Sequence, residues 1–489
     1  METMIKVIIS KPQYHAAFLI FLIFFLFLIF TEYNLHLEHS RRTRNIPNLF
    51  SEHDLRLPRE DNSLMMLEGQ QRDQIADEGN DGPVVDNKDD VNAYYFSMLV
   101  TEEDIEDFSV KLPDTLPNFK NPCWIEMVPE DFSYTNVTLY YQLFCLYPEN
   151  QPHGSWQDSY DYMENLIHAR KRYAVGSKAW RIRCFPYFFL LGFTKCGTSD
   201  LRRTLSFFPD FVDGITKEPK FWNKIRLRSY HGADMLPRPT LSDYLDLYDM
   251  AAEKIRSYVF VTEEGDTYHP AIIGDFDPMT VWKIPMWRKI KGNENRDAPK
   301  YLTPHHLHSI NPNIKFMILL RNPVERTFSH YKFFHSKNNR KVQAEMFHDD
   351  IKKTMQTLEK CFRDNAIRTC LYQPWKSNIT TIRSVTGSVY YVYLEDWLEV
   401  FPRKQFLFIR SEDYFQNRTA VLVEILRFLE IDSPIPKYLW RNLATLPVIN
   451  RSITSKMSNK TRILLQEFFA PMNRRLVSLL EDDRWRWHF

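Results

Sequence analysis

A lysine lies inside a glycine-bounded loop at the point where an apolar strand is expected to lead into a helix. Gly192 and Gly197 bound the loop, and Lys195 lies between them. The apolar run 188–191 before the loop predicts a buried strand, and the stretch 200–208 after it predicts a helix with leucines on one face. Backbone N–H groups converge in such a loop, and the helix dipole adds partial positive charge. The stretch therefore predicts a binding site for phosphate or a similar anion.

The loop resembles the Walker A pattern of phosphate-binding loops but departs from it at the lysine. Thr198 and Ser199 follow the second glycine as the pattern requires, yet Lys195 stands inside the loop instead of directly after Gly197. A lysine at this position would lie beside a phosphate chain, near the group being transferred. The alternative is an exposed loop lysine without a role, which the flanking glycines and the buried strand disfavour.

Two further segments place the loop in a family. The chain reads KEPKFW at 217–222 and LLRNPVERTFSHY at 319–331. With the loop, these segments resemble the Golgi carbohydrate sulfotransferases, which use 3′-phosphoadenosine 5′-phosphosulfate (PAPS) as donor. The resemblance extends from Pro186 to the C-terminus and implies a PAPS-dependent enzyme acting on a glycosaminoglycan. It further implies an acceptor hydroxyl at position 6 of N-acetylgalactosamine 4-sulfate in chondroitin or dermatan sulfate.

The resemblance assigns the loop to the phosphosulfate of the donor. Lys195 would be a catalytic cation near the oxygen that bridges phosphorus and sulfur, where charge develops on the leaving group. The backbone N–H groups of Cys196, Gly197, Thr198 and Ser199, with the two hydroxyls, would bind the 5′-phosphosulfate.

Glu218, in the second segment, matches the catalytic base of the heparan sulfate members of the family. A carboxylate beside the acceptor hydroxyl can take its proton as sulfur is attacked. Lys217 and Lys220 would hold Glu218 ionised. The alternative is a structural ion pair between Glu218 and these lysines.

Arg321 and Ser329, in the third segment, match the pair that binds the 3′-phosphate in the family. A guanidinium fork and a hydroxyl suit a terminal phosphate, which PAPS carries and ATP lacks. Arg451, with Lys456 as second candidate, is nearest to the family's basic loop over the nucleotide. Arg326 is expected to be structural.

Three alternatives remain open at this stage. Phe276 stands where the heparan-type enzymes carry a lysine and cannot supply its charge, which leaves the acceptor open; the alternative is a heparan-type or other glycan. A luminal kinase that binds ATP is opposed by the displaced Lys195 and by the pair Arg321 and Ser329. A non-catalytic luminal glycan-binding protein is opposed by the presence of Glu218 together with these residues.

Strands that alternate with helices must position these residues. The pattern predicts an α/β fold with a P-loop-like parallel sheet flanked by helices. The expected strands are 188–191, 210–212, 271–276, 314–320 and 406–409. The expected helices are 200–208, 241–255, 303–310 (capped by Thr303), 323–334, 419–429 and 464–480 with a kink at Pro471.

The N-terminal part predicts a membrane-anchored protein. Residues 16–30 form an unbroken apolar run of 15 residues without a small-residue cleavage site after it. An uncleaved signal anchor is favoured over a cleaved signal peptide. We expect a cytoplasmic tail at 1–15, the transmembrane anchor at 16–35, an acidic flexible stem at 36–110, a luminal cap at 111–183 and the sulfotransferase domain at 184–489. All five N-glycosylation sequons follow the anchor, which favours a single-pass type II Golgi protein; they begin at Asn136, Asn378, Asn417, Asn450 and Asn459.

Charge is unevenly distributed along the chain. Of 63 Lys and Arg and 62 Asp and Glu, the first 110 residues hold 9 and 20, which leaves 54 basic against 42 acidic residues in the remainder. A basic globular part favours a polyanionic partner such as a sulfated glycan. No nucleic-acid partner is expected, and a homodimer is an open possibility.

The six cysteines fit a secretory enzyme with one or two disulfides. The first expected pair is Cys361–Cys370, and the second is Cys123–Cys145, with Cys184 and Cys196 as candidates for free thiols. His305, His306 and His308 lie on one expected helix without Cys or carboxylate partners at ligand spacing, so no metal is expected.

Overall fold

The computed structural model describes the C-terminal four-fifths of the chain with gaps, namely residues 111–128, 174–175, 178–214, 218–227, 239–261, 264–337, 342–373, 375, 380–433, 435–448 and 456–487. These residues all belong to one compact unit, Asp86–Phe489. The expected tail, anchor and stem lie outside the described residues, as do Lys217, Arg451, Cys145 and the sequons at Asn136, Asn378 and Asn450. Within the described ranges, no helix combines the length and apolar character needed to cross a bilayer.

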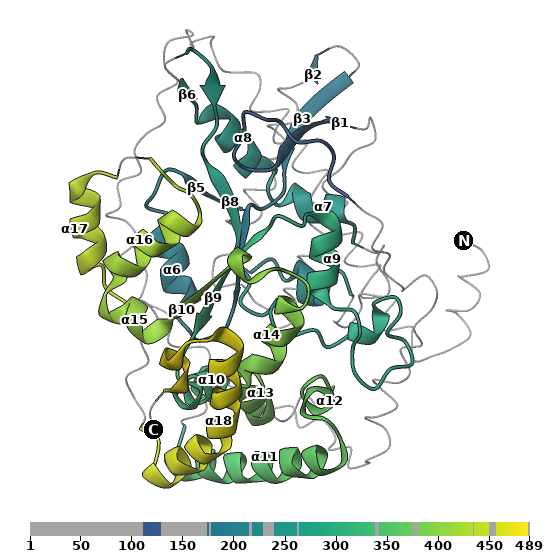
Figure 1. Ribbon diagram of the computed structural model, residues 1–489, viewed down its shortest axis with the longest axis vertical. Coiled ribbons are helices and arrows are strands. Elements are labelled where there is room, and N and C mark those ends of the chain that lie inside the picture. Colours follow the sequence, from purple (N-terminus) through teal and green to yellow (C-terminus); the bar gives the residue numbers. More distant parts are fainter. Residues whose placement is uncertain are drawn as a thin grey trace, which may run out of the picture. The chain divides into compact units, whose positions relative to one another are not determined.

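A five-stranded parallel sheet forms the centre of the fold, in the order β10-β9-β4-β8-β5. Its strands are β4 (Phe188–Gly192), β5 (Phe211–Asp213), β8 (Ile272–Asp275), β9 (Lys315–Leu320) and β10 (Phe406–Arg410). In Figure 1 it runs through the middle of the picture, with α6, α15 and α16 on one side and α9 and α14 on the other. The predicted α/β class with a parallel sheet flanked by helices is confirmed.

The helices of the described residues follow the strands in the expected alternation. They are α6 (Thr198–Leu205), α7 (Leu241–Asp246), α8 (Asp249–Ser257), α9 (Thr303–Ile310), α10 (Pro323–Lys337), α11 (Ala344–Asp364), α12 (Ile367–Leu371), α13 (Thr380–Thr386), α14 (Tyr390–Leu398), α15 (Ser411–Gln416), α16 (Arg418–Phe428), α17 (Lys437–Thr445) and α18 (Asn459–Leu480). A π-helical turn, η5, covers Phe221–Ile225.

The core is built on strand β4, whose five residues are all buried. A strand covered on both faces needs a continuous apolar run, which the sequence provides at this point. The ring of Phe188 packs edge-on against Phe276 at 5.6 Å, and Phe189 packs against Phe316 at 6.2 Å. A Cβ at Gly274 of β8 would approach the ring of Phe188 to 2.3 Å, so this close packing requires glycine there.

The order of the strands determines where a ligand would bind. Strand β4 lies between β8 and β9, so the chain leaves it first toward one edge of the sheet and later toward the other. Open α/β sheets bind ligands beyond the carboxyl ends of the strands at such a switch point. The segments that follow these carboxyl ends include Lys195, Asp277 and Arg321.

A second, three-stranded antiparallel sheet has the order β1-β3-β2, with β1 (Cys123–Val128), β2 (Ala174–Val175) and β3 (Lys178–Cys184). A disulfide joins Cys123 to Cys184, which face each other in the register of β1 and β3. The expected pair Cys123–Cys145 and the candidate free thiol at Cys184 are therefore wrong. Sixty-one residues separate the two cysteines in sequence, so only strand pairing brings them together.

The other predictions for the cysteines are confirmed. Cys361 and Cys370 form a disulfide that links the end of α11 to α12. Cys196 is a free thiol and is fully buried.

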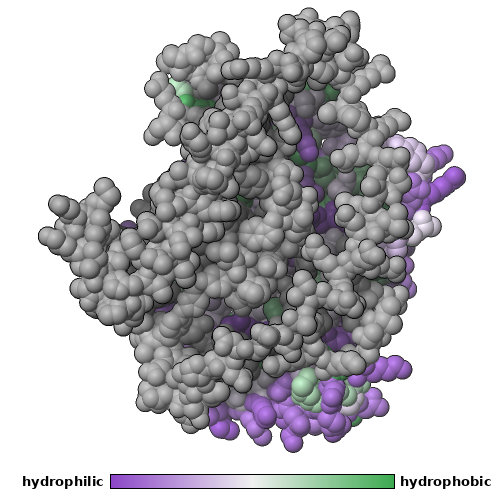
Figure 2. Space-filling model, turned by 180° about the vertical axis from the view of Figure 1, so that it is seen from behind, coloured by the Kyte–Doolittle hydropathy of each residue, from purple (hydrophilic) through white to green (hydrophobic). Residues whose placement is uncertain are grey.

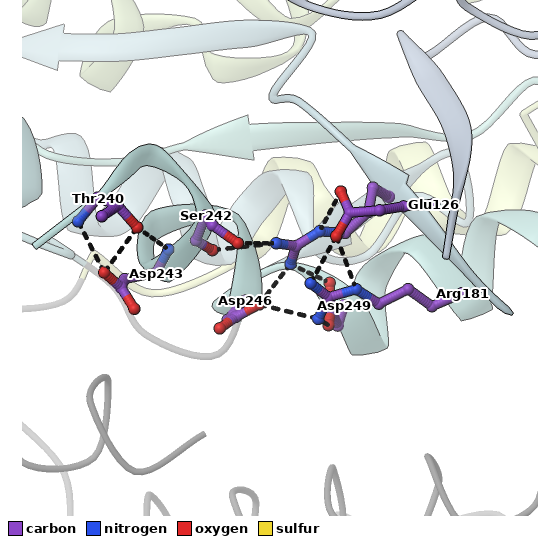
Figure 3. A network of polar contacts seen from close by, with 8 residues as sticks. Glu126, Arg181, Thr240, Ser242, Asp243, Asp246 and Asp249 are labelled. Carbon is purple, nitrogen blue, oxygen red and sulfur yellow. Dashed lines mark hydrogen bonds and ion pairs between the residues drawn. The ribbon is translucent and has the colours of Figure 1, made fainter. Parts of the chain in front are cut away.

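An ionic network joins the antiparallel sheet to α7 and α8, as Figure 3 shows. Arg183 has no exposed side-chain surface, and its Nη1 donates to Asp246 at 2.5 Å and to Asp249 at 2.8 Å. Arg181 donates to the same two carboxylates, each at 3.0 Å, and to Glu126 at 2.7 Å. Two guanidinium groups and three carboxylates thus form one ionic network where β1, β3 and the two helices meet.

Two expected helices differ from the observed ones. The stretch 241–255 forms two helices, α7 and α8, because Tyr248 leaves the helical conformation at φ −115° and ψ 2°. Asp246 and Asp249, on either side of the break, both contact Arg183. In α9, Leu302 precedes the first helical residue, so Thr303 is not the cap, although Pro304 lies in the first turn as expected.

The C-terminal helix α18 begins at Asn459, five residues before the expected start at 464. Pro471 lies within it. Trp485 and Trp487, which follow it, are only 1% and 3% exposed, so both pack in the core.

The long helix α11 has an amphipathic pattern. Its buried residues are Phe347, Ile351, Thr354, Met355 and Leu358. Its outer face is polar, and the lower end of the molecule in Figure 2, where α11 lies, is largely hydrophilic.

Candidate functional site

The glycine loop is anchored to the neighbouring strand β9. Phe193 N–H donates to the carbonyl of Leu319 at 2.8 Å, immediately after β4 ends. Arg321, just beyond β9, donates through Nη1 to the carbonyl of Lys195 at 3.2 Å. The Lys195 ammonium lies over the ring of Phe333 on α10, with Nζ 4.2 Å from the ring centroid. Lys195 and Arg321, far apart in sequence, therefore belong to one site.

Arg326 is hydrogen-bonded to the glycine loop through Thr194. Its side chain is fully buried, and Nε and Nη2 donate to the carbonyl and the hydroxyl of Thr194 at 3.0 and 2.7 Å. Its Nη1 donates to the carbonyl of Ser384 and to the hydroxyl of Ser388. All these partners are protein groups, which confirms the expected structural role.

The far end of the loop is the N-terminus of α6. Cys196 is buried, and its carbonyl accepts a hydrogen bond from the hydroxyl of Ser411 at 2.7 Å. Gly197, the N-cap residue, has φ +98°, and a Cβ there would meet the ring of Phe415 at 2.8 Å. No side chain caps the helix, and the first N–H groups of a helix have no partner within it. The predicted anion site at Thr198 therefore has the required local structure.

Three residues of the site adopt the left-handed conformation that favours glycine. Lys195, Glu218 and Lys220 have φ of 70°, 63° and 58°. Such strained residues persist where the surroundings over-determine them and often occur at functional sites. Both segments singled out from the sequence, the loop and KEPKFW, thus carry this strain.

A lysine of the second segment lies between a carboxylate of the same segment and the carboxylate of Asp277. The ammonium of Lys220 forms an ion pair with Glu218 on one side and lies 3.6 Å from Asp277 on the other. Burial alone would lower the pKa of Lys220, but Asp277 and Glu218 outweigh burial and raise it. Lys220 therefore remains charged and favours the ionised form of Glu218, as the sequence predicted.

The third segment places Ser329 on the second turn of α10, beyond Arg321. Both side chains are partly buried. Lys332, three residues after Ser329, lies on the same side of the helix. Burial lowers the pKa of Lys332, and the nearby charge of Arg321 lowers it further. Two cations and a hydroxyl thus come from one short stretch.

Comparison with known proteins gives the family of this arrangement. The family model described as a sulfotransferase domain matches residues 186–468, more than half of the chain. The chain is 31% identical over 397 residues to carbohydrate sulfotransferase 15 of Homo sapiens, which covers 79% of this chain and 68% of that protein. This chain belongs to the carbohydrate sulfotransferase family.

Two more distant relatives complete the comparison. Heparan sulfate glucosamine 3-O-sulfotransferase 6 of Homo sapiens is 23% identical over 319 residues, or 62% of this chain and 73% of that protein. A sulfotransferase structure from Alicyclobacillus acidocaldarius is 22% identical, covers 62% of this chain and 99% of that chain, and has a TM-score of 0.39.

The enzyme is therefore a PAPS-dependent sulfotransferase whose relatives modify carbohydrates. The uncapped start of α6 and the ammonium of Lys195 give this site a positive character. Arg321 and Lys332 add two further positive charges.

Positive charge also surrounds His330 of this sulfotransferase. The ring is buried, and its Nδ1 lies 2.8 Å from the hydroxyl of Ser384. Burial first, and then the nearby cations Arg326, Lys283, Lys195 and Arg383, lower the pKa of His330 well below its usual value. The histidine is therefore neutral.

The histidines considered for a metal have protein partners. His306 Nδ1 lies 2.9 Å from Nη1 of Arg226, and His305 Nδ1 accepts from the N–H of Leu302 at 3.2 Å. Within the described ranges, no group of three or more His, Cys, Asp or Glu side chains could hold a metal ion. His305, His306 and His308 therefore belong to no such group.

A buried carboxyl, Asp275, lies at the end of β8. It accepts hydrogen bonds from the hydroxyls of Tyr244 at 2.7 Å and Tyr248 at 3.1 Å. Burial raises its pKa to about 7, and the charge of Asp277 adds to the rise. The folded protein therefore holds this proton more tightly than the unfolded chain does.

This difference predicts a pH-dependent contribution of Asp275 to stability. The contribution is complete below the ordinary pKa of 3.8 and is lost as the pH rises through about 7. The free energy of unfolding of the wild type, relative to Asp275→Asn, should fall by roughly 1 kcal/mol per pH unit between these limits. Urea unfolding of both proteins over this range measures the difference. A difference independent of pH would contradict the prediction.

The structure brings several site residues together that the sequence did not connect. Asp277 lies 57 residues from Lys220 in sequence, yet the two residues are in contact. Lys332 was missed, although its spacing of three residues from Ser329 on a helix could have identified it. Ser411 had no local signal, because the start of α15 reaches the glycine loop only through the order of the strands.

Proposed function

We propose that this enzyme transfers the sulfuryl group of PAPS to position 6 of N-acetylgalactosamine 4-sulfate in chondroitin or dermatan sulfate. The observation that carries the proposal is that Arg321 contacts the Lys195 loop and that the Glu218–Lys220 pair contacts Asp277. Lys195, Arg321 and Asp277 all follow the carboxyl ends of neighbouring strands of the sheet. The similarity to carbohydrate sulfotransferase 15 supports a sugar acceptor. The specific sugar and position rest on the sequence resemblance.

The proposed chemistry assigns one task to each group. Glu218 takes the proton of the acceptor hydroxyl while the hydroxyl oxygen forms a bond to sulfur. The bond from sulfur to the bridging oxygen breaks, and the electron pair remains on the nucleotide phosphate. Lys195 and the N–H groups of Gly197, Thr198 and Ser199 stabilise that charge. The N–H of Cys196, also expected to bind the donor, donates instead to the carbonyl of Phe193 at 3.2 Å. Arg321 and Ser329 bind the 3′-phosphate, with Arg451 as a further nucleotide contact.

Charge supports an anionic acceptor. Lys283 and Arg383 act on buried His330 together with Lys195, so they lie near the proposed transfer point. Neither side chain is fully buried. Cations at such a place attract a sulfated polymer and raise its local concentration.

The full-length chain, incubated with sulfur-labelled PAPS and a panel of glycans, tests the proposal. We expect label on chondroitin or dermatan sulfate, and digestion to disaccharides should locate it at position 6 of 4-sulfated residues. Label on heparan sulfate alone would retain the donor chemistry and overturn the acceptor. A chain that neither transfers label nor binds 3′-phosphoadenosine 5′-phosphate would overturn both.

The cellular placement is part of the same proposal. It comprises a Golgi location and a single-pass type II anchor at 16–35 with a luminal catalytic domain at 184–489. Asn417 and Asn459 are sequons on exposed side chains, so a luminal domain should carry glycans there. Asn417→Gln and Asn459→Gln should each remove one glycosidase-sensitive increment of mass. An absence of any glycan would contradict the luminal orientation.

A further inference from the structure

The carboxylate of Asp277 organises the segment that carries Glu218. Its Oδ2 accepts from the backbone N–H of Lys220 at 2.9 Å and from the amide of Asn223 at 2.8 Å. Its Oδ1 accepts from the N–H of Met279 at 3.1 Å and lies 3.6 Å from the Lys220 ammonium. Asp277 is itself 1% exposed. One buried carboxylate thus contacts both the backbone and the side chain of Lys220.

Lys220 transmits this contact to Glu218. The lysine is 7% exposed, and its ammonium lies between the two carboxylates. Both Glu218 and Lys220 have positive φ, a conformation that non-glycine residues keep only when other contacts hold them. The hydrogen bond from Lys220 N–H to Asp277 supplies such a contact.

We infer that Asp277 is a positioning residue for the base: it holds Lys220 and the strained segment 218–220 so that the Glu218 carboxylate is fixed and only partly neutralised. The inference rests on the proposed role of Glu218 as base. It assigns Asp277 no contact with donor or acceptor.

The charges around Glu218 predict opposite effects for the two supporting residues. Without the Lys220 charge, Glu218 would lie near the Asp277 carboxylate with no cation between them, so it would hold a proton more tightly. Without the Asp277 charge, the Lys220 ammonium would interact with the Glu218 carboxylate alone. Glu218 would then lose its proton more readily and be a weaker base. Asp275, the other carboxyl at this end of β8, accepts hydrogen bonds from the hydroxyls of Tyr244 and Tyr248 and from the backbone of Asp277.

The test measures the pH profile of kcat/KM for Lys220→Gln and Asp277→Asn in the full-length chain. We expect the acid limb of the profile to shift to higher pH by about one unit in Lys220→Gln. In Asp277→Asn it should shift to lower pH by a similar amount. The kcat of Asp277→Asn at the plateau should fall by about tenfold, because the base is weaker and less firmly held. The double variant should have an acid limb between those of the single variants.

Asp275→Asn is the matched control, since it removes a carboxyl from the same segment without touching Lys220. We expect its acid limb to coincide with that of the wild type. The affinity for 3′-phosphoadenosine 5′-phosphate should stay within about threefold of wild type in every variant, because the donor contacts lie on other segments. A variant that loses this affinity has lost its fold, and the double variant then provides the comparison.

Two outcomes separate this inference from the proposed function. If Glu218→Gln keeps wild-type turnover, the assignment of the base is wrong and the proposed function loses its mechanism. If Glu218→Gln is inactive while Lys220→Gln and Asp277→Asn shift the acid limb in the same direction or not at all, the positioning role is overturned. Opposite shifts support it, since a merely structural residue would lower the rate without moving the limb.

Discussion

Lys195→Met is expected to lower kcat by about a hundredfold to a thousandfold, the usual cost of removing one group that stabilises developing charge. The side chain extends from a loop that β9 and Arg326 hold in place, so the change removes a charge and not the loop. The methionine side chain is long enough to keep the contact with Phe333. Initial rates with labelled PAPS measure the effect, and binding of 3′-phosphoadenosine 5′-phosphate measures the donor site separately.

Lys352→Met provides the matched control for this variant. Lys352 is an exposed lysine on α11 and should keep wild-type kcat when changed. A larger loss of donor affinity than of kcat in Lys195→Met would show that the lysine binds the ground state. Wild-type turnover in Lys195→Met would show that the leaving-group charge is stabilised by other groups.

Arg183→Met is expected to lower the free energy of unfolding by about 3–5 kcal/mol, because it leaves buried carboxylates without a partner. Arg183 has no exposed surface and bonds Asp246 and Asp249, which are themselves buried. Arg181 also contacts both carboxylates, but its guanidinium group alone cannot provide the hydrogen bonds that Arg181 and Arg183 provide together. Denaturant unfolding of the full-length chain measures the loss.

Arg256→Met is the corresponding surface control on α8. Its ion pair with Glu253 involves a side chain that is 49% exposed, and such pairs contribute at most about 1 kcal/mol. If both variants lost the same small free energy, the network of Figure 3 would contribute no more than a surface pair. An Arg183→Met variant with full stability would show that Asp246 or Asp249 becomes protonated at little cost.

Local patterns in the sequence predicted much of the fold and of the donor site. The apolar runs predicted all five strands of the parallel sheet to within about two residues. The glycine spacing predicted the loop, and the family resemblance assigned Lys195 and Arg321 to one donor, consistent with their contact in the structure. These features depend on neighbours within a strand, a loop or a helical turn, so they can be read from a short window.

Pairings between distant segments were decided by the tertiary structure. Cys123 bonds Cys184 because β1 and β3 align across 61 residues. Asp277 reaches Lys220 across 57 residues because β8 lies beside β5 in the sheet.

The sequence by itself therefore determined the class of fold, the family and the residue types that serve the donor. The tertiary structure alone decided which carboxylate supports Glu218, which cysteine closes the second sheet and which acids neutralise Arg181 and Arg183. The reason is physical: a side chain's type and its local spacing are encoded where it stands. The partner of a buried charge or thiol depends instead on the order and register in which the strands pair, which no short segment contains.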